Sequence, residues 1–263
     1  MKPLHTILFF GREYSLSFGF ILIALCIWEI LVHALDIADF ILPPPSSVLI
    51  KFYLSRHLLL THASVTLQEA LGGFVLGAGA GALLAIAMAR SRLVERMLYP
   101  LIVSSQTFPK EALAPLFVVW FGFGILPKII IAGLISFFPV VVNTTRGLLS
   151  VDPITLDLLH VLSASQRQIF LKVRLPNAVP YLFAALKMCI TLSVIGAVVG
   201  EFVGASAGLG HLIRLANSEM ATDLIFAALI TLGGMGTLLF LIVDGLEKLA
   251  LKRWGGAADP PGR

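Results

Sequence analysis

Six long apolar segments dominate this sequence and limit what it can fold into. They are Leu16–Leu35, Thr66–Ala89, Leu101–Phe121, Ile129–Leu148, Val179–Val203 and Leu224–Leu249. Each is roughly 20 residues or longer, which is enough for an α-helix to cross about 30 Å of hydrocarbon. A backbone in lipid must satisfy its own hydrogen bonds, and these segments lack the alternating pattern of barrel strands. We therefore predict an all-α membrane protein with six transmembrane helices in a single domain, residues 1–263.

The composition and the placement of the basic residues support a membrane location. Apolar residues make up 58% of the chain and charged residues 13%, whereas a soluble domain carries about 25% charge. Most of the 19 lysines and arginines lie at the two termini, after the second apolar segment and after the fourth. Because basic residues collect on the cytoplasmic side, both termini are predicted to be cytoplasmic. This bias accounts for the net charge of +4, so the bilayer is an expected partner and nucleic acid is not.

Small residues recur at every fourth position of the second apolar segment, beginning with Gly73, Gly77 and Gly81. On a helix they form one stripe, which favours the close approach of another helix. A phosphate-binding loop is the alternative, but the Gly-Lys-Ser/Thr ending of a P-loop is missing here and elsewhere in the chain. The three glycines are therefore predicted to pack helices. The histidines and cysteines have no metal-ligand spacing, so no metal site is predicted.

Several polar and aromatic residues interrupt the third, fourth and fifth apolar segments. Ionisable groups inside a membrane usually face a bundle interior or a water-filled path. We therefore expect Lys110, Glu111, Asn143 and Glu201 to line a translocation path, with Phe137 and Phe138 as candidate gate residues. For Lys110 and Glu111, a structural ion pair or an interfacial position is the alternative. For Glu201, the alternative is that it ties the following outer loop to the third segment.

A polar, helix-forming loop lies between the fourth and fifth segments, at residues 149–179. Asp152-Pro153 predicts a helix start, because an aspartate cap precedes a proline at the first helical position. Two capping-box spacings follow, Ser163 with Gln166 and Ser165 with Gln168, and predict a second short helix that ends at Leu175-Pro176. The loop is thus expected to form a compact two-helix knob. An amphipathic loop resting on the bilayer is the alternative.

The spacing of this loop, Asp157-Leu-Leu-x₃-Ser163-x₉-Val173-Arg-Leu175-Pro176, resembles the EAA-x₃-G-x₉-I-x-LP signature of ABC-importer permeases. Other parts of the chain carry the resemblance further: Pro109-Lys-Glu-Ala-Leu-Ala-Pro115, Trp120-Phe-Gly122-Phe-Gly124, Phe137-Phe-Pro139 and Gly208-Leu-Gly210. Together they resemble the nitrate/sulfonate/taurine-type permeases, which are type I importer subunits.

The resemblance implies a location in a bacterial inner membrane, a set of partners and a mechanism. Two copies of the chain would form a homodimer, with two ATPase subunits on the cytoplasmic side and a periplasmic or extracellular substrate-binding protein outside. ATP and Mg²⁺ would be bound by the ATPases, so the chain itself would carry no cofactor and would not be an enzyme. The cargo would be a small polar or anionic solute, such as a sulfonate, taurine, nitrate, or a pyrimidine or riboflavin-type vitamin precursor.

The resemblance also assigns the knob as the surface that couples to the ATPase. The residues implied are Asp157, Leu162, Ser163, Ala164, Arg167, Phe170, Leu175 and Pro176. Leu162, Ser163, Ala164 and Phe170 are expected to enter the groove of the ATPase. Ser163 stands where the family has glycine, and Leu158-Leu159 replace its paired alanines. We expect Ser163 to have a negative φ and to cap the second helix.

Two other classes of function compete with this interpretation. A membrane-embedded enzyme could use Lys110, Glu111 and Glu201 as acid and base. However, the sequence shows no Ser/His/Asp or His/Glu-x-x-His grouping to supply a nucleophile or a metal, so no catalytic residue is predicted. A membrane scaffold without transport activity is the third possibility, and association with an ATPase would distinguish it from an importer. Residues 255–263 are expected to be a disordered tail.

Overall fold

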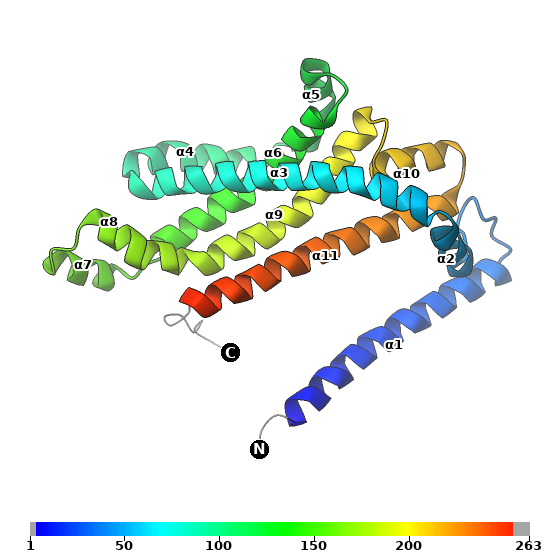
Figure 1. Ribbon diagram of the computed structural model, residues 1–263, viewed down its shortest axis with the longest axis horizontal. Helices are drawn as coiled ribbons and strands as arrows, with labels where there is room; N and C mark the ends of the chain where they lie inside the picture. The colour runs from blue at the N-terminus through cyan, green and yellow to red at the C-terminus, as the bar shows by residue number, and fades with distance from the viewer. Residues whose placement is uncertain (1–3, 255–263) are drawn as a thin grey trace. The chain divides into compact units, whose positions relative to one another are not determined.

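The computed structural model describes residues 4–254, with side chains from Gly19 to Lys252, and its regular elements there are all helical (Figure 1). They are α1 (Leu4–Ala34), α2 (Pro45–Leu54), α3 (Arg56–Arg90), α4 (Arg92–Ser105), the 3₁₀ helix η1 (Lys110–Leu113), α5 (Ala114–Phe121), α6 (Ile125–Leu149), α7 (Pro153–Val161), α8 (Gln166–Ile169), the π-helical η2 (Phe170–Arg174), α9 (Leu175–Gly204), α10 (Leu209–Ser218) and α11 (Thr222–Trp254). The all-helical prediction is confirmed. The predicted disordered tail, residues 255–263, lies outside the described residues.

Four stretches of helix are long and apolar enough to cross a membrane. They are Arg56–Arg90, Ile125–Leu149, Gln166–Gly204 and Thr222–Lys252. Each contains one of the predicted apolar segments. A shorter apolar stretch, Gly19–Ala34, belongs to α1, which extends from Leu4 beyond the start of the first predicted segment.

The third apolar segment is not one helix, so the prediction of a continuous helix over Leu101–Phe121 is wrong. Helix α4 ends at Ser105, and the chain resumes as η1 at Lys110 and as α5 at Ala114. Pro109 has no backbone N–H to donate and disfavours a helical conformation at the residue before it. The side chain of Pro115 then occupies the first turn of α5, where a proline is tolerated. Two short helices therefore replace one long one.

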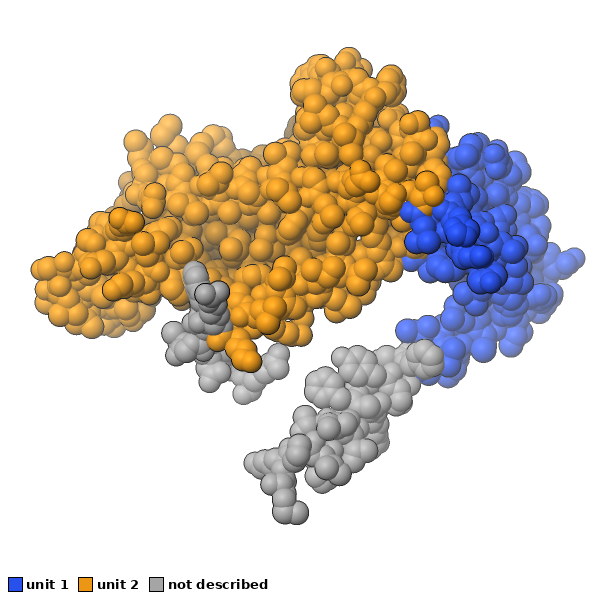
Figure 2. Space-filling model, in the orientation of Figure 1, with its two compact units in different colours: residues 1–60, 212–230 blue, residues 61–211, 231–263 orange. Residues whose placement is uncertain are grey.

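The chain divides into two compact units (Figure 2). The first unit comprises residues 1–60 and 212–230. Within it, Glu29 on α1 accepts hydrogen bonds from the backbone N and Oγ of Ser46, at 3.0 and 2.7 Å. Lys51 on α2 forms an ion pair with Asp223 on α11 at 3.2 Å. These polar contacts connect α1, the start of α2 and the start of α11 within the unit.

The second unit, residues 61–211 and 231–263, is organised around α6. Helix α3 packs on one side of α6 through Gly73, Gly77 and Gly81, whose Cα atoms lie against Ala132, Gly133 and Val140. A Cβ added to Gly77 would lie 2.6 Å from the carbonyl oxygen of Gly133. Helix α9 packs through Gly196, where an added Cβ would lie 2.6 Å from the Cα of Ala132. Helix α6 is therefore held between two helices at backbone contact distance.

This packing predicts different effects for two glycines on the same helix. Gly77→Ala should destabilise the protein by about 1–3 kcal/mol, because the new methyl group would overlap the backbone of α6. Gly79→Ala is the matched control, since an added Cβ there meets no atom within 4 Å. Thermal unfolding in detergent measures both effects. Equal melting temperatures for the two variants would contradict the packing.

Candidate functional site

The segment after α6 forms an exposed knob of two short helices, α7 and α8, at one end of the second unit (Figure 1). Helix α7 begins as predicted: Asp152 is its N-cap, its side chain accepts a hydrogen bond from the backbone N of Ile154 at 3.2 Å, and Pro153 follows. Four apolar side chains of this segment are exposed: Ile154 (77%), Leu158 (57%), Val161 (81%) and Leu162 (67%). Their spacing of four, three and one residues places them on one face of the helix. An exposed apolar face on a short helix is suited to the groove of a partner.

The predicted conformation of Ser163 is wrong. Its φ is +56°, and it follows the last turn of α7 rather than capping α8. The backbone N of Ser163 donates to the carbonyl of His160, and that of Ala164 donates to the carbonyl of Leu159, both at 2.9 Å. These two bonds form a Schellman motif, in which the residue in the left-handed conformation is usually glycine. A glycine would suit this position of the turn, because it adopts a positive φ easily. Serine adopts the same conformation at a cost in conformational free energy, because it carries a Cβ.

The second helix begins at the later of the two predicted capping boxes. Ser165 is its N-cap: its Oγ accepts from the backbone N of Gln168 at 3.3 Å, and Gln168 Oε1 accepts from the backbone N of Ser165 at 2.8 Å. Leu175-Pro176 lie at the start of α9, the helix of the fifth apolar segment, as predicted, but the second helix does not end before them. The π-helical turn η2 joins α8 to α9, with the N–H of Leu175 donating to the carbonyl of Phe170. Pro176 lies in the first turn of α9, where its missing N–H is tolerated.

The eight coupling residues named from the sequence differ in exposure. Asp157, Leu162, Ser163 and Arg167 are exposed, whereas Ala164, Leu175 and Pro176 are half-buried. Phe170 packs inward against the cluster of Ala89, Leu148 and Ala178, with the Arg90 guanidinium 4.9 Å from its ring centroid. Phe170 is therefore a contact between the knob and the helices. The exposed face of α7 includes Ile154, Leu158 and Val161, which the sequence analysis did not single out.

The named path residues do not form one cluster. Lys110 Nζ lies 4.5 Å from the ring centroid of Phe138, and Phe137 and Phe138 pack edge to face. Glu111 is exposed on η1. The side-chain amide of Asn143 donates to the carbonyl of Pro139, at 2.8 Å, inside α6. Lys110, Phe137 and Phe138 therefore connect η1 to α6, while Asn143 lies further along α6.

Glu201 is fully buried and belongs to a separate polar cluster. Its carboxylate accepts hydrogen bonds from the Thr66 hydroxyl, at 2.6 Å, and from the backbone N of Gly210. Gly208, with φ +111°, has no room for a Cβ because the Glu201 carboxylate lies against it. The Thr66 oxygen accepts in turn from the backbone N of Leu209 at 2.8 Å. Glu201 thus ties the Gly208–Gly210 turn to α3, not to the third apolar segment.

A buried ion pair, which the sequence analysis missed, joins α3 to α6. Lys128 Nζ lies 2.7 Å from Glu69 Oε1, and the two side chains are 7% and 1% exposed. The residues are 59 positions apart in the sequence. Glu69 fell inside an apolar segment and Lys128 just before one, so neither position by itself indicated a pair. The structure thus places one cation and one anion in the interface between the two helices.

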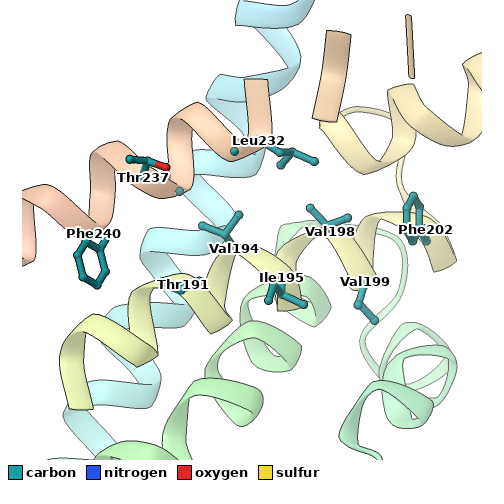
Figure 3. Close-up of a pocket in the computed structure, with 11 residues that line it drawn as sticks. Thr191, Val194, Ile195, Val198, Val199, Phe202, Leu232, Thr237 and Phe240 are labelled. Atoms are coloured by element: carbon teal, nitrogen blue, oxygen red, sulfur yellow. The ribbon is translucent and has the colours of Figure 1, made fainter. Parts of the chain in front are cut away.

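Helices α9 and α11 make a polar contact and enclose an apolar groove. Lys187 Nζ is 2.6 Å from Glu247 Oε2 and 3.3 Å from Asp244 Oδ1. The groove, of about 570 Å³, lies further along the two helices (Figure 3). Val194, Val198 and Phe202 line it from α9, and Leu232 and Phe240 from α11. In the part of the chain that the structure describes, no three His, Cys, Asp or Glu side chains gather to hold a metal ion.

Comparison with known proteins identifies the family. Residues 73–255 match the model of the binding-protein-dependent transport system inner membrane component. The chain belongs to this family. It is 36% identical, over 88% of its length and 93% of the relative's, to the formylaminopyrimidine transport permease protein ThiX of Halalkalibacterium halodurans. It is 37% identical, over 89% of its length and 88% of the relative's, to the riboflavin transport system permease protein RibX of Chloroflexus aurantiacus.

A solved structure agrees with the fold of this permease. A chain of the MetNI methionine ABC transporter, in an inward-facing conformation, aligns with a TM-score of 0.58 at 21% identity, covering 73% of the permease and 96% of that chain. The permease is the membrane component of an ABC importer. The enzyme alternative receives no support, because the family consists of transporter subunits. ATP hydrolysis in such an importer is carried out by a partner subunit.

The Schellman motif predicts that the permease is strained at Ser163. Ser163→Gly should stabilise the knob by about 1 kcal/mol, because glycine adopts a positive φ without a Cβ penalty. Hydrogen–deuterium exchange of the backbone from Leu159 to Gln166 should therefore slow roughly fivefold. Ser165→Ala removes the cap of α8 and should speed exchange in α8 instead. Faster exchange in Ser163→Gly would contradict the motif.

The buried pair predicts a double-mutant signature in the permease. Lys128→Met alone should destabilise it by roughly 3–5 kcal/mol, because Glu69 would be left buried without its partner. Adding Glu69→Leu should restore most of that loss. Lys51→Met is the control: its pair with Asp223 is about one-third exposed and should contribute about 0–1 kcal/mol. Unfolding in mixed micelles measures all four proteins, and a double variant as unstable as Lys128→Met would refute the interpretation.

Proposed function

We propose that this permease acts as a homodimer of single six-crossing domains, with both termini and the knob in the cytoplasm of a bacterial cell. In this arrangement α4, η1 and α5 together make one interrupted crossing. The distribution of lysine and arginine supports the orientation, since it favours the cytoplasm for both ends and for residues 149–179. A crossing built from two short helices is compatible with a membrane protein where other helices or a water-filled path satisfy the freed backbone groups.

The main observation in favour of an ATPase contact at the knob is the exposed apolar face of α7. Ile154, Leu158, Val161 and Leu162 would fill the groove of the ATPase, and Arg167 would contact its rim. Phe170 would connect the knob to α3, α6 and α9 by packing against Ala89, Leu148 and Ala178. Movement of the ATPase would then reach the helices of the second unit through packed side chains rather than through a flexible linker.

ATP would supply the bias between two conformations of the dimer. Closure of the two ATPases would draw the knobs together and open the permeases toward the substrate-binding protein, and hydrolysis would return them to the inward-facing state. Lys110, Glu111, Phe137, Phe138 and Asn143 would contribute to the path. Glu201 would hold the turn at the outer end of α9.

The cargo is proposed to be a small nitrogen heterocycle of the pyrimidine or riboflavin type. Relatives that match across nearly their whole length carry formylaminopyrimidine and riboflavin in their names. Aromatic and branched apolar side chains around the fourth and fifth crossings suit a flat organic solute better than nitrate. Sulfonates and taurine remain the alternative cargo, which the binding protein would select.

The ATPase contact predicts opposite results for two neighbouring residues of α7. Val161→Asp should abolish co-purification of the ATPase subunit in detergent, because it places a charge in the apolar face. His160→Asp is the matched control, since it adds the same charge one residue earlier on a different side of the helix. Val161 is 81% exposed, so neither variant should change the melting temperature of the permease. Retention of the ATPase by Val161→Asp would refute the assignment.

A further inference from the structure

A second cavity lies beside the C-terminal end of α6, apart from the groove between α9 and α11. It measures about 530 Å³ and lies between α4, α6 and α9. Six of the side chains that line it can form polar or aromatic contacts: Glu95, Tyr99, Thr145, Arg146, Ser150 and Tyr181. Its volume lies within the range of small-molecule sites, roughly 300–1,000 Å³. All its lining residues belong to the second unit.

Three polar side chains of this cavity, those of Glu95, Arg146 and Thr145, form no side-chain hydrogen bond or ion pair within the described part of the chain. Among the described residues, Arg146 and Glu95 have no ion-pair partner and do not pair with each other, although both line the cavity. Thr145 is 1% exposed, and its hydroxyl has no hydrogen-bond partner among the residues that the structure describes. A buried hydroxyl without a partner is costly. A ligand in the cavity that hydrogen-bonds Thr145 would remove this cost.

Contacts between α6 and α9 fix the position of one wall of the cavity. Asn177 on α9 donates to the Ser150 hydroxyl and to the carbonyl of Gly147, both at 2.9 Å. Tyr181, one turn further along α9, lies against Gly147, where an added Cβ would be 2.7 Å from the tyrosine Cβ. The close approach of α6 and α9 therefore positions Tyr181 and Ser150 before any ligand arrives, which lowers the cost of binding.

The charges select between kinds of solute. Arg146 offers donors to a carbonyl or ring nitrogen, and its planar guanidinium can stack on a flat ring. Glu95 and the C-terminal end of α6 favour amino or N–H donors, because the carboxylate accepts hydrogen bonds and the helix end is partially negative. A simple anion would meet the Glu95 carboxylate, and a simple cation would meet Arg146. Tyr99 and Tyr181 add two aromatic surfaces for a planar body.

We propose that this cavity is a binding site, on the permease itself, for a flat nitrogen heterocycle that carries both amino donors and carbonyl or ring-nitrogen acceptors. The proposal rests on the proposed function, because it treats the ligand as the transported solute. Ser150 caps the end of α6 only three residues before α7 begins. A solute bound here contacts the segment that leads directly into the ATPase-binding knob.

Equilibrium binding to the purified full-length permease tests the proposal without the substrate-binding protein. The first probe is riboflavin, whose binding is followed by its own fluorescence. The second is 4-amino-2-methylpyrimidine, which is tested as a competitor of riboflavin and directly by calorimetry. Taurine is measured for comparison. The wild type is expected to bind at least one of the two heterocycles and to prefer it to taurine. Arg146→Gln and Glu95→Gln are each expected to weaken that binding about tenfold or more. Arg96→Gln, an exposed arginine on α4 outside the cavity, is expected to leave it unchanged.

Three results would overturn the proposal: binding of neither heterocycle by the wild type, preference for taurine, or wild-type affinity in both Arg146→Gln and Glu95→Gln. Melting temperatures establish whether each variant is folded. If one variant does not fold, the affinity of the other decides the test. Co-purification of the ATPase is scored separately on the same proteins. A permease that binds the heterocycle but no ATPase would count against the proposed function. A permease that binds the ATPase but no heterocycle would count against the binding site in the cavity.

Discussion

The contact of α6 with two glycine-bearing helices is the constraint on which the rest of the second unit depends. Ala132 lies between Gly73 of α3 and Gly196 of α9, so the three backbones meet at one level. No side chain larger than hydrogen fits at those glycines without moving a helix. Because lipid supplies no hydrophobic drive between helices, such close packing must supply much of the attraction. The buried pair of Lys128 and Glu69 joins α3 to α6, and the cavity beside Arg146 is lined by residues of both α6 and α9.

The two ends of the packed helices differ in chemistry. At one end, Glu201 of α9 and Thr66 of α3 bind the turn at Gly208–Gly210, and Glu69, one turn further along α3 from Thr66, pairs with Lys128 of α6. At the other end, the apolar face of α7 is exposed and Phe170 packs against the helices. A chain of this family uses ATP that a partner hydrolyses, so it must receive movement rather than generate it. A fixed turn at one end, a packed middle and an exposed knob at the other end meet that requirement.

The sequence allowed the helices to be predicted more reliably than their breaks and contacts. Long apolar segments require helices in a membrane, and Asp152-Pro153 specifies the start of α7 locally. The break before Pro109 was missed because hydropathy continues across it. Ser163 was misassigned because two overlapping Ser-x-x-Gln spacings fit a capping box, and only the last turn of α7 decides between them. The Lys128–Glu69 pair and the Arg146 cavity bring together residues from different helices, which no local pattern reveals.

We propose that α3, α6 and α9 move as one body with the knob when the ATPase binds ATP. Spin labels at His160 and Val203 of one permease copy, diluted with unlabelled copies and assembled with the ATPase, test it most directly. Cys26, which is exposed, would be replaced by serine, while buried Cys189 would remain. If the helices and the knob move as one body, the distance distribution between the labels is the same in the nucleotide-free and ATP-bound states. A shift or broadening of that distribution on ATP binding would contradict it.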